Sequence, residues 1–393
     1  SAASDVYKRQ LLGALIFFVS FSFGYGQEKG EEAGKPEVPK STAPALGSLE
    51  WHFNALKDKR VEIRLSAVNA LGNIGTEEAL KGLGEALKDT DTKVRKTVVE
   101  VLSKVGGESV IPYLTEALKD KDSGVRTLAV DKLAKMKSIS TIASLTLALK
   151  DEKTSIRTAA VQALSNFTGD LVIAPLTEAL KDTDEDIRIL ALKSLANIGG
   201  DAVISPISSA LQDPEKSVRL VAVAELLKMN KPEALHSLTS ALKDGDLEIR
   251  TKVINALGAS GDSTVVPYLA EVLSSPDARV HIITVNALGA IGGTGAVGAL
   301  TQALKNKDLE FRIAVIDVLG ALGDSSAVPE LVKILNEDNR LEIRTATVKV
   351  LGEIGDRAAL PVLNELTQTG PKELQPIVKE AILKIVKKRS EKK

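Results

Sequence analysis

Apolar residues in this chain recur with the spacing of a helix face, and the same arrangement returns every 31 residues. The segment 76–107 is representative. Its first half places leucines at i, i+3 and i+7, namely Leu80, Leu83 and Leu87. A short polar turn follows, and the second half then carries its own apolar set, Val98, Val99, Leu102 and Val105. The pattern predicts two amphipathic helices separated by a short turn.

An arginine that follows Val, Ile or Phe marks the start of each second helix. The steps between these arginines are 31 residues, except for one step of 62 that spans His281 and a last step of 32. The series is Arg64, Arg95, Arg126, Arg157, Arg188, Arg219, Arg250, Arg312 and Arg344. Glycine ends most of the second helices, at the left-handed position that follows a helix. The chain is therefore an array of nearly identical units.

Two short helices cannot bury both of their apolar faces alone, but stacked copies share one continuous core. We therefore predict an all-α fold. It is an α-α superhelix, a solenoid of about ten 31-residue helix pairs plus a divergent C-terminal pair.

The turn inside each unit carries acidic residues at fixed positions. One aspartate lies six residues before the arginine, and a second acid often follows it, where it can cap the second helix. An arginine in the first turn of a helix opposes the helix dipole, so we expect a carboxylate beside it, from its own or a neighbouring repeat. We interpret the series as a structural ladder, with a functional row of cations as the alternative. Its members are Asp89, Arg95, Asp120, Arg126, Asp151, Arg157, Asp182, Arg188, Asp213, Arg219, Asp244 and Arg250.

One unit departs from the ladder. Ser275 stands where the aspartate belongs and His281 where the arginine belongs, and Asn306 replaces the next aspartate. We interpret the joint replacement of the aspartate by Ser275 and of the arginine by His281 as the relaxation of one contact that leaves neither charge without a partner. A pH-sensitive joint and the rim of a binding patch are the alternatives for His281.

The ends of the chain differ from the repeats. Residues 1–10 resemble the translation of a sequencing adaptor and are interpreted as an artefact. Residues 11–26 form an apolar run that is typical of a secretory signal peptide and shorter than the roughly 20 residues that span a bilayer. Residues 27–47 predict a flexible linker, 48–388 the solenoid and 389–393 a basic tail. The sequence thus predicts an exported chain, periplasmic or extracellular, with an uncleaved N-terminal anchor as the alternative.

Composition narrows the chemistry. The chain has no cysteine, so disulfides, thiolate metal sites and cysteine nucleophiles are excluded. A net charge of −1 and 3% aromatic residues argue against nucleic-acid binding. GTGAVG at 293–298 lacks the preceding strand of a dinucleotide site, and the acidic loops at 182–186 and 244–248 lack the glycine and glutamate of a calcium loop. We predict no catalytic residue, no metal and no cofactor.

The repeated outline ALKDxDxxVRxxAVxALGxIG resembles the HEAT repeats of the phycobilisome-lyase-like family, over residues 48 to about 388. The resemblance implies a HEAT solenoid, but the family contains both enzymes and scaffolds. Its hydroxylase members use His-Glu pairs, whereas none of His52, His236 and His281 is followed by Glu. An enzyme or enzyme accessory of this family is the alternative to a scaffold.

In HEAT solenoids the second helix generally lines the concave side, so its positions 1, 2, 5 and 9 after the arginine form the expected binding face. Along the chain, position 9 changes from Asn and Lys to Ala near residue 250. The predicted partner-binding residues are Ile282, Ile283, Asn286, Ile313, Asp317 and Asn255. The sequence predicts a monomeric, non-enzymatic scaffold that binds a protein or peptide there.

Overall fold

The computed structural model describes residue 45 and residues 47–390, which contain 22 α-helices and no strand. The residues assigned to an adaptor artefact (1–10) and a signal peptide (11–26), and nearly all of those assigned to the linker, lie outside this range, so these assignments stay predictions. The last helix, α23, continues to Ser390, two residues into the segment expected to be a tail. Of the described residues, 52–390 form one compact unit, which holds nearly all of the helical residues.

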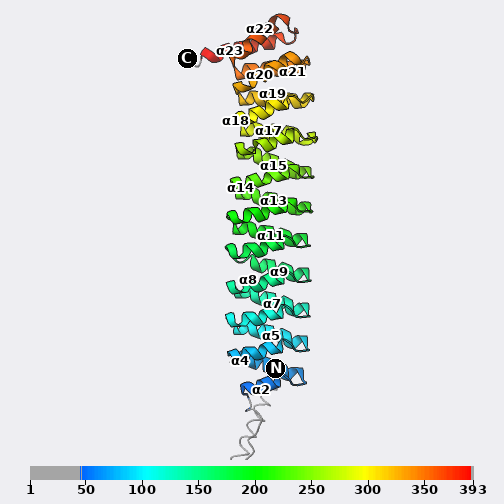
Figure 1. Ribbon diagram of the computed structural model, residues 1–393, viewed down its shortest axis with the longest axis vertical. Helices are drawn as coiled ribbons and strands as arrows, with labels where there is room; N and C mark the ends of the chain where they lie inside the picture. Colours follow the sequence, from blue (N-terminus) through cyan, green and yellow to red (C-terminus); the bar gives the residue numbers. More distant parts are fainter. Residues whose placement is uncertain (1–44, 46, 391–393) are drawn as a thin grey trace, which may run out of the picture. The chain divides into compact units, whose positions relative to one another are not determined.

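The helices are arranged in pairs that stack in the order of the sequence (Figure 1). The first helices of the pairs are α2 (Leu49–Ala55), α4 (Glu77–Ala86), α6 (Ile111–Ala117), α8 (Ile142–Ala148), α10 (Ile173–Ala179), α12 (Ile204–Ser209), α14 (Pro232–Leu238), α16 (Val266–Leu273), α18 (Gly293–Ala303), α20 (Val328–Glu337) and α22 (Leu360–Thr369). The second helices are α3 (Val61–Ile74), α5 (Thr92–Val105), α7 (Ser123–Met136), α9 (Thr154–Leu164), α11 (Glu185–Ile198), α13 (Lys216–Met229), α15 (Leu247–Ser260), α17 (His281–Ile291), α19 (Leu309–Leu322), α21 (Leu341–Ile354) and α23 (Gln375–Ser390). The predicted solenoid of ten pairs and a terminal pair, α22 and α23, is confirmed.

Local signals fix where the second helices begin and end. The second acid of the turn caps several of them; the Asp91 carboxylate, for example, accepts a hydrogen bond of 2.7 Å from the backbone N–H of Lys93. Glycines with positive φ end many of them, as at Gly75, where φ is 65°. Lys137 and Asn230 occupy the equivalent place in two repeats and keep positive φ values of 51° and 49°. The backbone shape of the repeat is therefore conserved even where the glycine is not.

The core lies between the two helices of a pair and between neighbouring pairs. Each second helix packs on the next, as α3 on α5, α5 on α7 and α15 on α17. The expected core residues of the representative repeat are buried: Leu80, Leu83, Leu87, Val98, Val99 and Leu102. The last position of the predicted stripe is different, because it lies in the final turn of the helix, where Val105 is half-buried and the equivalent Ile74 is 40% exposed.

The repeat that contains His281 starts its second helix in another way. Residues Ala278–Val280 form a 3₁₀ turn, η8, and the α-helix α17 begins only at His281. In the neighbouring repeat α15 begins at Leu247, three residues before Arg250. The ladder position of this repeat is thus at the very start of the α-helix instead of inside its first turn.

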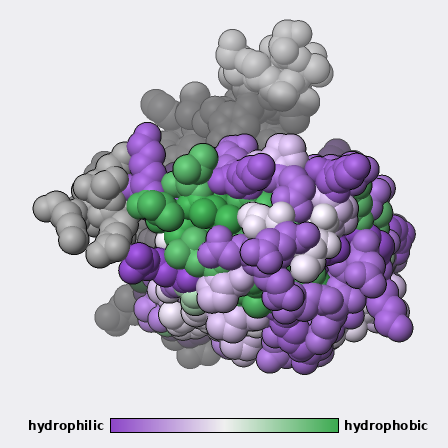
Figure 2. Space-filling view, turned by 90° about the horizontal axis from the view of Figure 1, so that it is seen from above, coloured by the Kyte–Doolittle hydropathy of each residue, from purple (hydrophilic) through white to green (hydrophobic). Residues whose placement is uncertain are grey.

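Figure 2 views the end of the stack formed by α22 and α23, where hydrophobic surface is bordered by hydrophilic surface. On α23 the side chains of Leu383 and Val386 are 69% and 54% exposed. Among the described residues, no helix is both long and apolar enough to cross a bilayer.

Candidate functional site

Successive second helices pack on one another, so positions 1, 2, 5 and 9 after each ladder residue recur from repeat to repeat along the stack. We call this set of positions the second-helix face. Because α17 packs between α15 and α19, the predicted binding residues of these three helices belong to the same stretch of it. Asn255 lies on α15, Ile282, Ile283 and Asn286 lie on α17, and Ile313 and Asp317 lie on α19. The polar residues Asn255, Asn286 and Asp317 are exposed. Of the isoleucines, Ile282 is 41% exposed, and Ile283 and Ile313 are half-buried.

This stretch of the second-helix face carries two charged side chains, Lys252 and Asp317. Its position-9 residues are the exposed alanines Ala259, Ala290 and Ala321. The only acidic side chain among the predicted binding residues is Asp317, and the isoleucines supply apolar area between the two asparagines. A surface of this kind can accept an apolar segment and hydrogen-bond to it at its margins.

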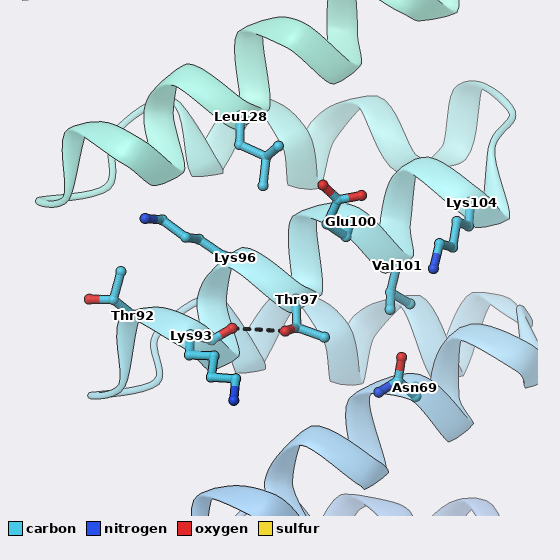
Figure 3. A pocket seen from close by; sticks show the side chains of 9 residues that line it. All are labelled: Asn69, Thr92, Lys93, Lys96, Thr97, Glu100, Val101, Lys104 and Leu128. Carbon is cyan, nitrogen blue, oxygen red and sulfur yellow. Dashed lines mark hydrogen bonds between the residues drawn. The ribbon is translucent and has the colours of Figure 1, made fainter. Parts of the chain in front are cut away.

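Further toward the N-terminus the same face is hollowed and basic (Figure 3). A hollow of about 580 Å³ lies on helices α3, α5 and α7, and its lining residues are Asn69, Thr92, Lys93, Lys96, Thr97, Glu100, Val101, Lys104 and Leu128. Lys96 Nζ lies 3.4 Å from Asp122 Oδ1, and Glu100 Oε2 lies 3.0 Å from Lys132 Nζ. Lys93 and Lys104 have no ion-pair partner among the described residues. The hollow therefore retains positive charge.

The arginines and aspartates of the turns form a regular series of contacts along one edge of the stack. Arg95 Nε donates to Asp120 Oδ2 at 2.6 Å and Nη2 to Oδ1 at 2.9 Å, while Nη1 donates to the backbone carbonyl of Asp89 at 2.9 Å. The same two-pronged contact joins Arg64 to Asp89, Arg126 to Asp151, Arg157 to Asp182, Arg188 to Asp213 and Arg219 to Asp244. Each arginine thus binds the carboxylate of the following repeat, 25 residues away, and a carbonyl of its own turn.

Burial and pairing oppose each other in these contacts, and pairing prevails. The hydrogen bonds that Arg126 donates to Asp151 raise the pKa of Arg126 above its ordinary value, although burial acts to lower it. Burial acts to raise the pKa of Asp151, but hydrogen bonds from Arg126 and from the backbone of Lys153 bring it below its ordinary value. Both partners are therefore held in their charged forms.

The pairing shows that one interpretation from the sequence is wrong. The side chains of Ser275 and His281 do not stand in for the two partners of one ladder ion pair, because each ion pair joins residues 25 apart in successive repeats. Ser275 lies in the register of Arg250, and His281 in the register of Asn306. Arg250 instead donates from Nη2 to Asp277 Oδ2 at 2.5 Å.

His281 preserves half of what the ladder arginine does. Its Nε2 lies 2.9 Å from the backbone carbonyl of Ser275, and the carbonyl can only accept, so this nitrogen donates. The same turn carbonyl receives Nη1 of the arginine in regular repeats. The buried imidazole also packs 5.5 Å from the ring of Phe311, measured between centroids. His281 thus packs inside the repeat stack, and among the described residues it forms no hydrogen bond with a predicted binding residue.

The other candidate motifs have ordinary structural surroundings. GTGAVG forms the first turns of α18, directly after the Gly292 cap of α17. In the acidic loop at 182–186, Asp182 pairs with Arg157 and Asp184 caps α11. No cluster of three or more His, Asp or Glu side chains suited to a metal ion occurs among the described residues.

Sequence reasoning missed one recurring element, the Asp-x-Arg turn. In Asp58-x-Arg60, Asp277-x-Arg279 and Asp338-x-Arg340, the arginine binds the aspartate two residues before it through both its backbone N–H and its guanidinium. The signal is readable in the sequence, since these are the turns in which arginine occupies that position. It matters because Asp277 and Asp338 each also contact a ladder arginine.

Acid is expected to weaken the contact at Asp338. Hydrogen bonds from Arg340 and the charge of Arg312 lower the pKa of this carboxyl from 3.8 to about 2, although burial opposes the shift. A lowered native pKa stabilises the fold above pH ~4, and this contribution is lost as the pH falls from ~4 to ~2. Urea unfolding at several pH values should show this loss in the parent chain and a flatter profile in Asp338→Asn. Asp170→Asn, at an exposed carboxyl on the 3₁₀ turn Asp170–Val172, should keep the parent profile. A parent-like profile in Asp338→Asn would contradict the assignment.

A sequence-profile comparison identifies the repeats. A sequence profile described as HEAT repeats matches residues 49–134, 116–196, 142–217, 173–251, 204–289, 268–347 and 299–383. No curated protein matches the chain. Among solved structures, YibA from E. coli is 23% identical with a TM-score of 0.33, and the match covers 62% of this chain and 92% of that one. Human deoxyhypusine hydroxylase in complex with glycerol is 21% identical with a TM-score of 0.31, with 81% and 99% covered. Scores this low carry no argument about the site.

Proposed function

The chain belongs to the HEAT-repeat family, and on that premise we propose that it is a non-enzymatic scaffold that binds a protein or peptide on its second-helix face. The observation that supports this proposal is the exposed stretch on α15, α17 and α19. Ile282 and the half-buried Ile283 and Ile313 provide apolar contact area there, and Asn255 and Asn286 provide hydrogen-bonding groups beside it.

The charge of the face favours an extended partner with two chemically different parts. An apolar segment suits α15–α19, whereas the hollow on α3–α7 carries Lys93 and Lys104 and suits acidic side chains. Helical stacks present such long surfaces because each repeat adds a helix to the same face. The proposal therefore includes a partner that is apolar at one end and acidic at the other.

The proposal places the scaffold outside the cytoplasm, as a monomer. This part rests on the apolar run at 11–26 and the polar segment at 27–47. The enzymatic alternative rests on the sequence resemblance to a family that includes enzymes, and no contact among the described residues favours it.

Peptide display on the whole chain tests the binding face. Peptides selected on the parent chain should bind at least 10-fold more weakly to the variant Ile283→Asp with Asn286→Arg, because charge replaces apolar contact at the centre of the patch. Asn286→Arg alone keeps the test independent of folding, since this side chain is exposed. The matched control is Gln302→Arg with Lys305→Asp, two exposed positions on and just after α18, which should stay within twofold. Equal binding to all variants would refute the site.

A further inference from the structure

We propose that the interrupted ladder position at Arg250 is a binding site for a carboxylate carried on an apolar group. The site lies at the turns and first helices of two successive repeats, and it goes beyond the scaffold function proposed for the second-helix face. The ligand would supply the carboxylate that an aspartate supplies in the regular repeats.

A cavity occupies this position. It measures about 780 Å³, within the range of small-molecule sites, and Arg250, Ser275 and Asp277 line it. At the preceding, intact contact, the corresponding space between the turns, lined by Arg219 and Asp244, is about 250 Å³. The space is thus larger where the aspartate is missing.

The walls of the cavity are largely apolar. They come from the 3₁₀ turn η6 (Thr239–Lys243), from α16, and from η8 and the residues before it. The apolar lining residues are Leu242, Tyr268, Val272, Pro276 and Val280. A ligand that fills this space needs an apolar body beside its charged group.

Arg250 donates fewer hydrogen bonds to a carboxylate than the regular ladder arginines do. In the regular contact both Nε and Nη2 donate to one carboxylate. In Arg250 only Nη2 reaches a carboxylate, that of Asp277, and Nε has no hydrogen-bond partner among the described residues. A guanidinium fork matches a carboxylate best when both of its donors on one edge are used.

Asp277 does not depend on Arg250. Arg279 binds the same carboxylate with Nε at 2.8 Å and Nη2 at 2.6 Å, and its backbone N–H donates at 3.1 Å. The charge of Asp277 is therefore already balanced when Arg250 turns toward a ligand. The hydroxyl of Ser275 is buried and has no hydrogen-bond partner among the described residues, so this side chain does not replace the missing carboxylate at Arg250.

The remaining charged groups at the cavity restrict the ligand to a single negative charge. Lys243 Nζ lies 2.7 Å from Glu271 Oε1, and Asp244 is paired with Arg219. Within each of these two pairs the positive and the negative charge balance. Arg250 is therefore the cation at the cavity whose Nε is still free to donate to a carboxylate. A polyanion would meet Asp277, Asp244 and Glu271, whereas a monocarboxylate meets Arg250 alone.

Matched acids and amides test the site by isothermal titration on the whole chain. The small-molecule probe is 4-phenylbutyrate with its amide as control, and the peptide probe is acetyl-Ala-Leu-Phe as free acid with its C-terminal amide as control. We expect at least one acid to bind 10-fold or more tightly than its amide. The stronger of the two acids tells whether a free organic acid or a chain terminus is the better occupant. If neither acid binds, or if acid and amide bind equally, the proposal is wrong.

Ser275→Asp provides the decisive variant, because it restores the residue found at this position in most repeats and should fold. Its carboxylate should occupy the fork of Arg250, weaken the binding of the acid at least 10-fold and raise the melting temperature. Asn306→Asp adds the same carboxylate one repeat further on, at a position that does not line the cavity, and should leave binding within twofold. Unchanged binding in Ser275→Asp would overturn the proposal.

Discussion

Replacing Arg95 with methionine is expected to lower the free energy of unfolding by about 3–5 kcal/mol, because it leaves a buried carboxylate without its counter-charge. The side chains of Arg95 and Asp120 are only 3% and 5% exposed. The guanidinium also donates to the backbone carbonyls of Asp89 and Thr90. One substitution therefore removes the partner of a buried carboxylate in the following repeat and the partner of two carbonyls in the turn of its own repeat.

The matched control is Arg60→Met. Arg60 makes a similar contact with Asp58, but its side chain is 70% exposed, so we expect a much smaller change in the free energy of unfolding. Urea unfolding gives the overall effect. Hydrogen exchange locates it, since repeat arrays open locally and Arg95→Met should lower protection first in α5 and α7. Equal unfolding of the two variants would show that the ladder contact contributes no more than a surface ion pair.

A second substitution separates two contributions to the free energy of unfolding: the destabilisation by an unpaired buried charge and the stabilisation by the ion pair itself. In Arg95→Met with Asp120→Leu, no charge remains buried, so most of the lost stability should return. Recovery would show that the ladder contributes mainly by requiring a match between neighbouring repeats. That would agree with Ser275, where loss of one aspartate is accompanied by a new partner for Arg250.

The fold was predictable because each level of the sequence indicates the same structure. Apolar spacing defines two helices, capping acids and glycines define their ends, and the 31-residue period requires that copies share a core. The prediction was wrong in detail where the final turn of a helix lies at the surface, as at Ile74. Periodicity identifies which side of a helix is apolar, but it does not show how far the neighbouring repeat extends.

The partner of each ladder arginine could not be derived from spacing. In a 31-residue repeat, an aspartate six residues before an arginine implies another aspartate 25 residues after it. Both distances fit the sequence equally well, and only the stacking of the repeats brings Asp120 to Arg95. The same ambiguity led to the mistaken pairing of Ser275 with His281. It also concealed the cavity, because replacement of the aspartate by Ser275 affects Arg250 in the preceding repeat.

For the binding face, the sequence predicted which positions lie on it but not the shape of the surface that they form. Helical spacing places Asn286 and Asp317 on one flank, and the structure exposes both. The basic hollow on α3, α5 and α7 depends on how three helices are offset relative to one another, and a single-helix pattern does not contain that information. Close approaches between helix backbones were missed for the same reason.

One such approach gives the second large effect, at Gly258 in α15. A methyl group added there would lie 2.7 Å from both Cα and Cβ of Ala287 in α17. At Gly72 an added methyl would meet only the side chain of Val101, which can rotate. Because α17 can relieve the clash at Gly258 only by moving its backbone, we expect Gly258→Ala to lower the free energy of unfolding by about 2–3 kcal/mol.

The sign of this effect separates packing from helix propensity. Alanine is favoured over glycine inside a helix by about 1 kcal/mol, so propensity alone predicts that Gly258→Ala stabilises. Gly298 in α18 is the matched control, since an added methyl meets nothing within 4 Å, and Gly298→Ala should stabilise by about 0.5–1 kcal/mol. Urea unfolding should therefore move in opposite directions for the two variants. Stabilisation by both would mean that α15 and α17 can separate freely, and the continuity of the second-helix face across them would then have to be abandoned.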